Sequence, residues 1–221
     1  MNIKLYVQTL LPALGWTALL TVTSLTVGVA LGLVIGLARV GPVRSLRNAA
    51  AIYVELVRGI PLFVQILYIY YGIGYLIRNI YVPSPFVSAT VAFGICYAAY
   101  IAEIFRAGFQ SLDRGQAEAA RALGMTRRQT TRLVLLPQAF RNILPALGNE
   151  GVALLKDTSL ASVVTIGELT QAGRALSSLT LKSFEVWTVV ALIYVALTLP
   201  LSWGVRKLEA RLRVRGAAHP A

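Results

Sequence analysis

The stretch EAARALGMTRRQTTRLVLLP, residues 118–137, is polar and strongly basic, and it lies inside a chain that is otherwise apolar. Asp113, with a glutamine three residues on, predicts the capped start of a helix just before it, and TRRQ, residues 126–129, predicts a second one. Gly124 stands between them as a typical helix stop. We therefore expect two helices joined by a glycine turn. The segments on either side decide which fold carries this hairpin.

The composition is that of a membrane protein. Of the 221 residues, 57% are hydrophobic and 14% are charged, and the mean hydropathy is +0.68. Soluble domains average about 45–50% apolar and about 25% charged residues. The net charge of +12 can indicate nucleic-acid binding, but in a membrane protein it more often reflects cytoplasmic lysine and arginine. The single cysteine, Cys96, lies in an apolar run, and we interpret it as a small packing residue.

Five apolar segments have the length of a membrane-spanning helix, which takes about 20 residues. We expect spans at about residues 14–37, 51–77, 87–107, 142–165 and 186–205. Pro12 and Gly15 are expected to break the first helix near its start, leaving residues 2–11 as a short helix on the outer surface. The predicted fold is an all-α membrane protein, a single transmembrane domain over residues 1–221.

Lysine and arginine gather on one side of these spans. Sixteen of the 21 basic residues lie there: Arg39, Arg44, Arg47, Arg58, Arg106, Arg114, Arg121, Arg127, Arg128, Arg132, Arg141, Arg206, Lys207, Arg211, Arg213 and Arg215. Cytoplasmic loops of membrane proteins carry an excess of positive residues. We therefore expect the N-terminus outside and the C-terminus in the cytoplasm. The hairpin then lies in a cytoplasmic loop, about residues 108–141, between spans three and four.

This loop resembles the EAA loop of ATP-binding-cassette (ABC) importer permeases. The family pattern is EAA, three residues, glycine, nine residues, isoleucine, one residue and Leu-Pro. The chain has residues 118–120, Gly124, Val134 and residues 136–137 at those places, with valine for isoleucine as the one departure. The segments VELVRGIPLFVQILY, AAYIAEIFRAGFQSLDRGQAEAARALGM and LPALGNEGVALLKDTSLASVVTIGELT resemble the polar amino acid branch, which serves histidine, arginine, glutamine and glutamate systems. The likeness covers about residues 14–205.

The resemblance implies a permease subunit that moves polar amino acids across the bacterial inner membrane by alternating access. The hairpin would be the coupling helix, held in a groove of a cytoplasmic ATPase. The coupling residues implied are Gly115, Glu118, Ala119, Ala120, Leu123 and Gly124. The partners implied are two ATP-binding cassette ATPase subunits that carry ATP and Mg, a second permease copy in a homo- or heterodimer, and an extracytoplasmic amino acid-binding protein. Alternatively, Glu118 pairs within the helix with Arg121.

Span four contains charged residues, which at membrane depth usually face a bundle interior or a water-filled path. The candidate pathway residues are Asn149, Glu150, Lys156, Asp157, Thr158 and Ser159. At about 100° per residue, the first four fall within an arc of about 120° on one helix. A face with both signs of charge suits a zwitterionic amino acid. The alternative is a structural network, in which Lys156 is neutralised by Asp157 or Glu150 and joins two permease copies.

The base of span two predicts a conformational joint. Gly59 and Pro61, in the sequence RGIP, are expected to form a kink or gate hinge, because the two residues together loosen a helix. The tyrosines between residues 68 and 81 are typical of the aromatic belt at a membrane interface, here the outer one.

No pattern in the chain predicts catalysis. We find no phosphate-binding glycine loop, no metal-ligand spacing and no nucleophile with a matched base, so ATP hydrolysis is expected in a separate subunit. Two remaining pairs, Glu55 with Arg58 and Glu103 with Arg106, have the i,i+3 spacing of structural ion pairs.

Two other interpretations compete with the permease. An ion-coupled secondary carrier would transport amino acids without an ATPase, although the two halves of the chain show no inverted repeat. A membrane-anchored regulator would use the hairpin as a DNA-binding helix-turn-helix. That motif normally needs a third packing helix in a soluble domain, and membrane spans flank the hairpin here.

Overall fold

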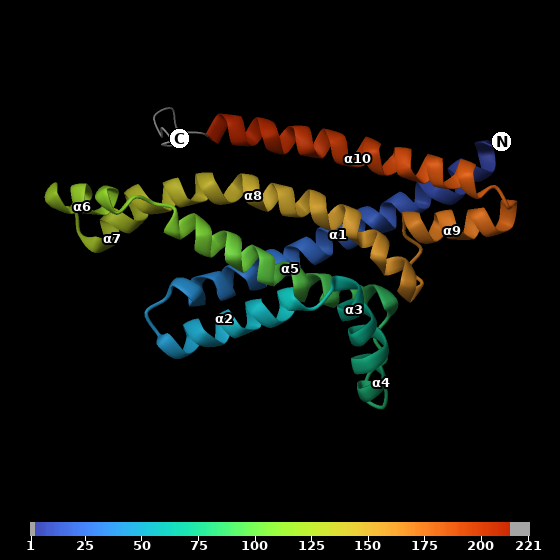
Figure 1. The fold of residues 1–221 in the computed structure, drawn as a ribbon, viewed down its shortest axis with the longest axis horizontal. Coiled ribbons are helices and arrows are strands. Elements are labelled where there is room, and N and C mark those ends of the chain that lie inside the picture. The colour runs from blue at the N-terminus through green and yellow to red at the C-terminus, as the bar shows by residue number, and fades with distance from the viewer. Residues whose placement is uncertain (1–2, 213–221) are drawn as a thin grey trace.

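The computed structural model describes residues 3–212, and every regular element in that range is helical. Four long helices run roughly along one axis: α1 (Ile3–Val40), α5 (Pro85–Gln110), α8 (Leu136–Asp157) and α10 (Ser183–Leu212), with α2 (Arg44–Gly59) beside them (Figure 1). The shorter elements are α3 (Leu62–Leu67), π-helical η1 (Tyr68–Ile73), α4 (Gly74–Ile77), α6 (Arg114–Ala122), α7 (Arg127–Gln129), π-helical η2 (Thr130–Leu135), 3-10 helical η3 (Thr158–Val164) and α9 (Leu169–Thr180). The expected all-α class is confirmed.

The helices of the structure do not correspond one to one with the five expected spans. Among residues 3–212, α1, α5 and α10 are each long and apolar enough to cross a membrane. Within the expected span at residues 51–77 the chain turns by 100° between α2 and the segment Leu62–Ile77, and a membrane crossing by this bent segment stays a prediction. The expected span at residues 142–165 changes from α8 to η3 after Asp157. A membrane crossing by α8 stays a prediction.

Helix α1 continues through Pro12 and Gly15, so the expected break near its start is wrong. A proline inside a helix removes one backbone hydrogen bond and costs about 3 kcal/mol. Tertiary packing offsets this loss. Tyr6 and Leu10, which precede the proline in α1, are buried in a cluster with Leu176 of α9 and with the start of α10.

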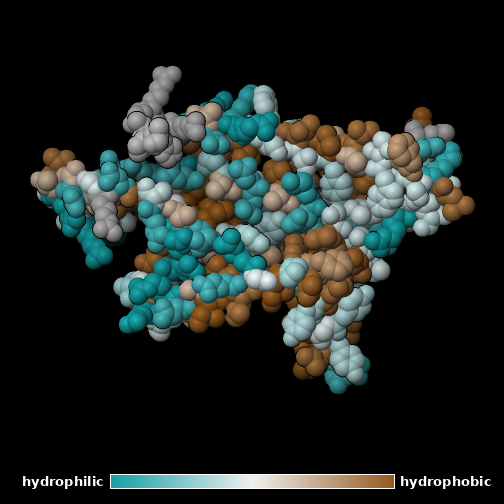
Figure 2. Space-filling model, viewed as in Figure 1, coloured by the Kyte–Doolittle hydropathy of each residue, from teal (hydrophilic) through white to brown (hydrophobic). Residues whose placement is uncertain are grey.

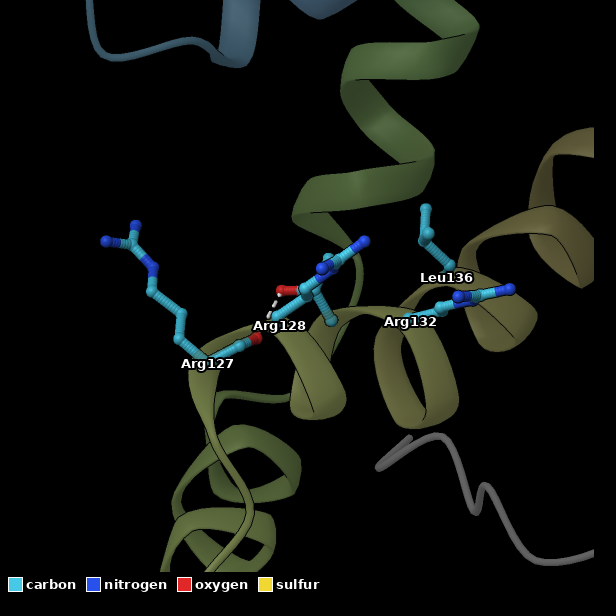
Figure 3. A pocket seen from close by; sticks show the side chains of 5 residues that line it. Arg127, Arg128, Arg132 and Leu136 are labelled. Atoms are coloured by element: carbon cyan, nitrogen blue, oxygen red, sulfur yellow. Dashed lines mark hydrogen bonds between the residues drawn. The ribbon is translucent and has the colours of Figure 1, made fainter.

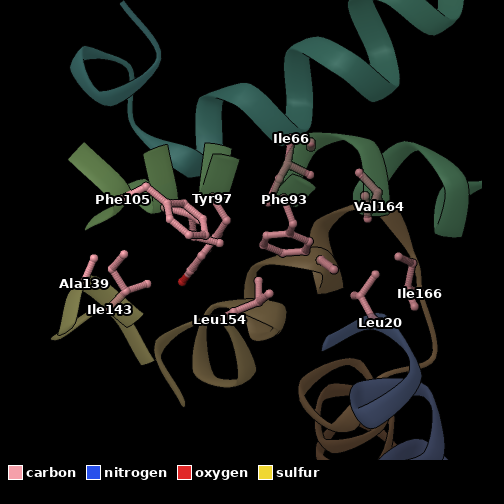
Figure 4. Packing of buried hydrophobic residues seen from close by; sticks show 14 residues of the cluster. Leu20, Ile66, Phe93, Tyr97, Phe105, Ala139, Ile143, Leu154, Val164 and Ile166 are labelled. Carbon is pink, nitrogen blue, oxygen red and sulfur yellow. The ribbon is translucent and has the colours of Figure 1, made fainter. Parts of the chain in front are cut away.

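Helix α5 lies at the centre of the main core (Figure 4). Its buried side chains include Phe93, Tyr97, Ile101 and Phe105. The surrounding elements contribute Leu20 of α1, Ile66 of α3, Ile143 and Leu154 of α8, and Val164 and Ile166 after it. This core joins α1, α3, α5 and α8, and it therefore supports both the bend after α2 and the charged segment of α8.

A stripe of small residues brings α1 against α5. Gly28, Gly32 and Gly36 lie on the same side of α1 and are buried. A Cβ atom on Gly32 would lie 2.7 Å from Cγ2 of Ile101, and one on Gly36 would lie 2.7 Å from Cβ of Phe105. Small side chains allow the backbones of membrane helices to approach closely. The stripe thus sets the distance between the two helices.

The predicted hairpin lies at one end of the bundle. Helices α6 and α7 project beyond α5 and α8 at the end where α10 finishes, and α1 begins at the opposite end (Figure 1). The hairpin and the end of α10 thus lie at the same end of the bundle, and the side of the membrane that this end faces stays a prediction. Arg213 and Arg215, which we counted on that side, lie outside the described residues.

Candidate coupling and translocation site

The turn of the hairpin is a Schellman motif at the end of α6. The backbone N–H of Met125 donates to the carbonyl of Ala120 at 3.1 Å, and that of Gly124 donates to the carbonyl of Arg121 at 2.9 Å. Gly124 has a φ of 80°, in the left-handed region that favours glycine. The predicted glycine turn is confirmed, and its geometry explains why a side chain at this position would strain the backbone.

Both helix starts in the hairpin are capped. The Asp113 carboxylate accepts a hydrogen bond from the backbone N–H of Gly115 at 2.9 Å, while Gln116 does not complete a capping box. The second predicted box is complete. The Thr126 hydroxyl accepts from the backbone N–H of Gln129, and the Gln129 side chain accepts from the backbone N–H of Thr126 at 2.8 Å. Hydrogen bonds therefore stabilise the start of α6, the turn at Gly124 and the start of α7.

One face of α6 is open to a partner. Glu118 and Ala119 are exposed there, as is Leu123 directly after the end of the helix. Leu123 is 83% exposed, whereas Ala120 is 5% exposed and lies against the rest of the hairpin. Glu118 forms no ion pair with Arg121, whose Nε atom donates to the backbone carbonyl of Ala117 at 3.2 Å. The intrahelical alternative for Glu118 is therefore not formed.

Three arginines surround an open hollow on the second helical segment of the hairpin, α7 and η2. Arg127, Arg128 and Arg132, together with Thr131 and Leu136, line a volume of about 700 Å³ (Figure 3). Their side chains fan out from α7 and η2. All three are exposed, and among the described residues none is within 4.0 Å of a carboxylate. We call these three residues the arginine surface. Its unpaired positive charge suits an acidic partner.

The charged residues of α8 lie on a partly open face. Asn149 and Lys156 are exposed, and Glu150 and Asp157 are half-buried. Asp157 accepts a hydrogen bond from the hydroxyl of Tyr97 at 2.8 Å. Among the described residues, Lys156 forms no ion pair with Glu150 or Asp157. The alternative network, in which Lys156 is neutralised by Asp157 or Glu150, is therefore not formed within one chain.

The comparison with known proteins now decides the family. The chain matches the family described as binding-protein-dependent transport system inner membrane component, over residues 28–214. The chain belongs to this family. The match confirms the resemblance to ABC importer permeases that the hairpin motif predicted. It also favours the permease over the ion-coupled carrier and the DNA-binding regulator.

Individual relatives are similar over nearly their whole length. The glutamine transport system permease protein GlnP of Escherichia coli K12 is 37% identical, with 90% of each chain covered. The arginine transport system permease protein ArtQ of Bacillus subtilis is 33% identical, with 92% of each covered. The crystal structure of an amino acid ABC transporter with histidines has a TM-score of 0.87 at 39% identity, covering 93% of this permease and 95% of that chain.

Two of the six candidate pathway residues of the permease, Thr158 and Ser159, do not lie on the open face of α8. Thr158 is buried, and its hydroxyl donates to the backbone carbonyl of Leu155 at 2.7 Å. Ser159 is half-buried in η3, where the helix has changed its period. The open polar face is therefore made by Asn149, Glu150, Lys156 and Asp157.

Arg58 is a residue of this site that the sequence did not identify. It lies at the end of α2, and its guanidinium is 5.0 Å from the ring centre of Tyr100 on α5, a cation–π contact. It is also close enough to attract the Glu150 carboxylate of α8. The expected pair with Glu55 is not formed. Spacing within a helix could not show that α5 offers Arg58 an aromatic face.

The second expected ion pair is confirmed and extended. The Arg106 Nε atom donates to Glu103 at 2.9 Å, and Arg39 of α1 approaches the other oxygen of the same carboxylate at 3.4 Å. Glu103 thus links α1 and α5 near the end of the bundle that carries the hairpin.

The bend of the permease after α2 occurs at the predicted position. Gly59 ends α2 and Pro61 precedes α3. Gln65 is buried, and its Nε2 atom donates to the backbone carbonyls of Val57 and Ile60, each at 2.8 Å. The bend is therefore a joint fixed by a side chain. The sequence signal was available, since Gln65 is a lone polar residue within an apolar run, but its partners lie across the break.

Proposed function

We propose that this permease is the membrane subunit of an ATP-driven importer of polar amino acids in the bacterial inner membrane. The observation that carries the proposal is the capped helix–glycine–helix hairpin, with its open α6 face, at one end of a helical membrane bundle. Relatives named as glutamine and arginine permeases support the substrate class. The permease is not itself an enzyme. ATP and Mg would be held by two partner ATPase subunits.

The hairpin is built to transmit movement. Leu123 offers an exposed apolar side chain for a groove on the ATPase, beside Glu118 and Ala119. Ala120 supports this face from within, and Gly115 and Gly124 lie at its two ends. From Arg127 the helix runs through α7 and η2 into α8 without a loop. A displacement of the coupling residues would therefore reach the charged face of α8 directly.

The α8 face would line the pathway between two permease chains. Glu150 and Asp157 can attract the ammonium group of an amino acid, and Lys156 and Asn149 can bind its carboxylate. Arg58 adds a second cation near Glu150. Ionisable residues at membrane depth need such a polar neighbour or a water-filled path, because lipid cannot solvate them. The proposed topology puts the N-terminus and the amino acid-binding protein outside, and the C-terminus and the ATPases in the cytoplasm.

The test is transport by the reconstituted complex. The permease is purified with its ATPase and binding protein, placed in liposomes, and supplied with labelled glutamine or arginine. Uptake that needs ATP supports the proposal, and uptake that proceeds without an ATPase supports the secondary carrier instead. Failure of both amino acids would reject these two substrates, and the other polar amino acids would then be tested through the binding protein.

Gly124 tests the coupling step separately. Valine strains a left-handed backbone, at about 1–2 kcal/mol for a residue with a side chain, whereas asparagine tolerates it better. We expect Gly124→Val to keep ATP hydrolysis but lose most uptake, and Gly124→Asn to retain both. The membrane content of each variant is the control. Normal uptake by Gly124→Val would contradict a coupling role for the turn.

A further inference from the structure

A carboxyl group without a cation is buried near the end of the bundle that is opposite the hairpin. Glu168 is 0% exposed, and it is the one charged residue among the described residues that is buried. It directly precedes α9, between the fourth and fifth expected spans, at the end where α1 begins (Figure 1). No lysine or arginine of residues 3–212 lies within 4.0 Å of it. Charged side chains are almost never fully buried unless they are paired, so Glu168 is a candidate for a role in function.

Hydrogen-bond donors take the place of a cation around Glu168. Its Oε1 atom accepts a hydrogen bond from the backbone N–H of Gln171 at 2.7 Å. Its Oε2 atom accepts from the backbone N–H of Thr170 at 2.8 Å and from the Tyr194 hydroxyl of α10 at 3.2 Å. The Tyr194 hydroxyl is also 3.1 Å from that of Thr170. The three donors to the carboxyl favour its charged form, whereas burial opposes it.

This polar group separates two hydrophobic cores. Along the chain, the main core ends at Ile166 and a second core begins again at Leu169, so the chain crosses between the cores at Glu168. Helix α1 crosses at buried Thr17, whose hydroxyl accepts from the backbone N–H of Leu169 at 3.1 Å. The second core consists of Tyr6, Leu10, Leu169, Leu176, Val186 and Val190. We call the polar residues between the cores the seam: Thr17, Glu168, Thr170 and Tyr194.

The seam lies at the far end of the helix that carries the proposed pathway. From α8 the chain continues into η3 without a loop, and a turn at residues 165–167 then leads to Glu168. Thr158, next to the pathway residue Asp157, lies close enough to interact with the Tyr194 hydroxyl. Closely packed cores resist deformation, so relative movement concentrates between them. A movement of α8 is therefore taken up at the seam or transmitted across it to α9.

Water lies close to the buried carboxyl. Thr165 and Gly167, in the turn just before Glu168, are exposed, and so are Arg174 and Ser178 of α9. Figure 2 shows hydrophilic residues over this end of the bundle. The proposed topology places this end outside. A proton from the outer solution therefore has a short route to Glu168.

The surroundings of Glu168 determine how firmly it holds a proton. Burial raises the pKa of the Glu168 carboxyl, and the hydrogen bonds described above offset only part of this rise. Tyr194 is the titratable group that faces it from α10. On α1, Thr17 does not titrate and Tyr6 is buried in the second core; η3 carries no charged side chain, and Arg174 of α9 is exposed. No neighbouring charge therefore cancels the effect of burial.

We propose that Glu168 is a positioning residue of the transport cycle, which binds a proton from outside while the two cores are packed together and releases it when the seam opens. The inference rests on the transport function proposed above. The protonated carboxyl would donate to the Tyr194 oxygen, and the Tyr194 hydrogen would turn to the Thr170 hydroxyl. The packed seam thus stays hydrogen-bonded with or without the proton. The proton returns to the outer water on opening.

The sign of the pH effect follows from the raised pKa. In the open seam water surrounds the carboxyl and its pKa is ordinary, so the packed seam holds the proton more tightly. The proton therefore stabilises packing below the ordinary pKa of glutamate, and this stabilisation is lost as the pH rises through the raised value. Because opening is part of each cycle in this proposal, uptake slows as the outer pH falls through that window.

The experiment uses the complete transporter in liposomes, with ATP inside and with saturating binding protein and labelled glutamine or arginine outside. The outer pH is varied between about 5 and about 8, where a glutamate with a raised pKa titrates, and the inner pH is held constant. Glu168→Gln removes the titration, and Tyr194→Phe removes one donor to the charged form. Glu185→Gln is the matched control, because Glu185 lies in α10 at the same end and pairs with Lys182 at 3.4 Å, outside the seam.

A second measurement does not depend on transport. Infrared difference spectroscopy of the purified transporter follows the C=O band of a protonated carboxylic acid as the pH is lowered. The band of Glu168 is the one that Glu168→Gln removes and Glu185→Gln retains. We expect this band to appear within the same pH window in which uptake slows.

We expect uptake by the wild type and by Glu185→Gln to slow as the outer pH falls, and uptake by Glu168→Gln to be independent of pH in this window. Tyr194→Phe should move the wild-type profile to higher pH by about one unit, because the charged carboxyl loses a donor. If Glu168→Gln does not assemble, the wild type and Tyr194→Phe carry the test.

Two results would overturn the inference. One is a Glu168→Gln transporter that keeps the wild-type pH profile and only loses thermal stability, since Glu168 would then be no more than the cap of α9. The other is the absence of a Glu168 band at every pH. If the wild type shows no ATP-dependent uptake of any polar amino acid, the proposed function fails, and the infrared titration still decides whether Glu168 binds a proton.

Discussion

Gln65 shows how one side chain can fix a bend that glycine and proline only permit. Pro61 has no N–H to donate, so the Val57 carbonyl of α2 loses its usual donor four residues on and keeps a 3.4 Å bond from the N–H of Ile60. The Gln65 side chain, four residues beyond the proline, donates to this carbonyl and to that of Ile60, each at 2.8 Å. The same amide lies 3.7 Å from the Cys96 sulfur on α5, so the joint is also placed against the core.

Replacing Gln65 with leucine should loosen this joint. The carbonyls of Val57 and Ile60 would lose the Gln65 donor, and each hydrogen bond lost costs about 0.5–1.5 kcal/mol. We expect the thermal midpoint of the purified complex to fall and uptake to fall with it. Gln8→Leu is the matched control, because Gln8 is an exposed glutamine of α1. Equal midpoints for the two variants would show that the joint does not depend on the amide.

Asp157 can be tested for a role beyond structure. Its carboxylate accepts from Tyr97, and an asparagine oxygen can accept the same bond, so Asp157→Asn removes the charge and keeps the contact. We expect near-normal assembly and at least about tenfold slower uptake, equivalent to about 1.4 kcal/mol. Tyr97→Phe is the complementary variant, with the charge kept and the bond removed. Loss of assembly in Asp157→Asn before any loss of transport would assign Asp157 to structure.

For single residues, the sequence predicted contacts between residues that are close along the chain and missed contacts between different helices. The capping box of Thr126 and the turn at Gly124 involve residues within five positions of each other, and both are confirmed. Arg58 was matched with a residue on its own helix, but its contact is Tyr100, which the fold brings from α5. The open face of α8 was predicted by helical phase up to Asp157. Helical phase also puts Thr158 on the opposite side of the helix, and its side chain is buried there, at the start of η3.

Among the elements, α1 and α5 form a closely packed pair because of glycine. The repeat of Gly28, Gly32 and Gly36 is visible in the sequence, but which helix it faces is a property of the fold. Pro137, a residue type that often ends a helix, shows the opposite limit. The proline lies in the first turn of α8, where a missing N–H is tolerated, and the N–H of Leu136 donates to the carbonyl of Thr131 in the π-helical segment before it.

Gly32→Ala should separate α1 from α5. The added methyl would lie 2.7 Å from Ile101 Cγ2 and 3.0 Å from the carbonyl oxygen of Ala98, which cannot move as a side-chain end can. Overpacking of this kind costs about 1–3 kcal/mol. Gly15→Ala, on the same helix with no atom within 4 Å of the added methyl, is the control. We expect a lower thermal midpoint for Gly32→Ala alone, and equal midpoints would mean that the helices shift apart without loss.

In the whole molecule, positive charge and open surfaces divide between the two ends. The hairpin carries the arginine surface at one end, and an apolar arm, residues 61–82, leaves the bundle in the other half. Composition predicted a membrane protein and the charge bias predicted which loops gather together. Neither could predict the arm, because hydropathy treats residues 51–77 as one apolar run. The 100° turn within it depends on packing of Ile66 and Gln65 against α5.

The arginine surface should contribute to binding of the ATPase through charge. Exposed charge pairs contribute about 0.2–1 kcal/mol each and weaken as salt screens them. Changing Arg127, Arg128 and Arg132 together to glutamine should therefore raise the Kd of the solubilised permease for its ATPase about tenfold, or about 1.4 kcal/mol, and flatten its dependence on ionic strength. The control changes Arg44, Arg47 and Arg206, three exposed cations outside the hairpin, and removes the same net charge. Equal losses in both triple variants would mean that net charge alone draws the subunits together. No loss in either would leave binding to the apolar contact of Leu123, whose change to alanine would then be the one that weakens it.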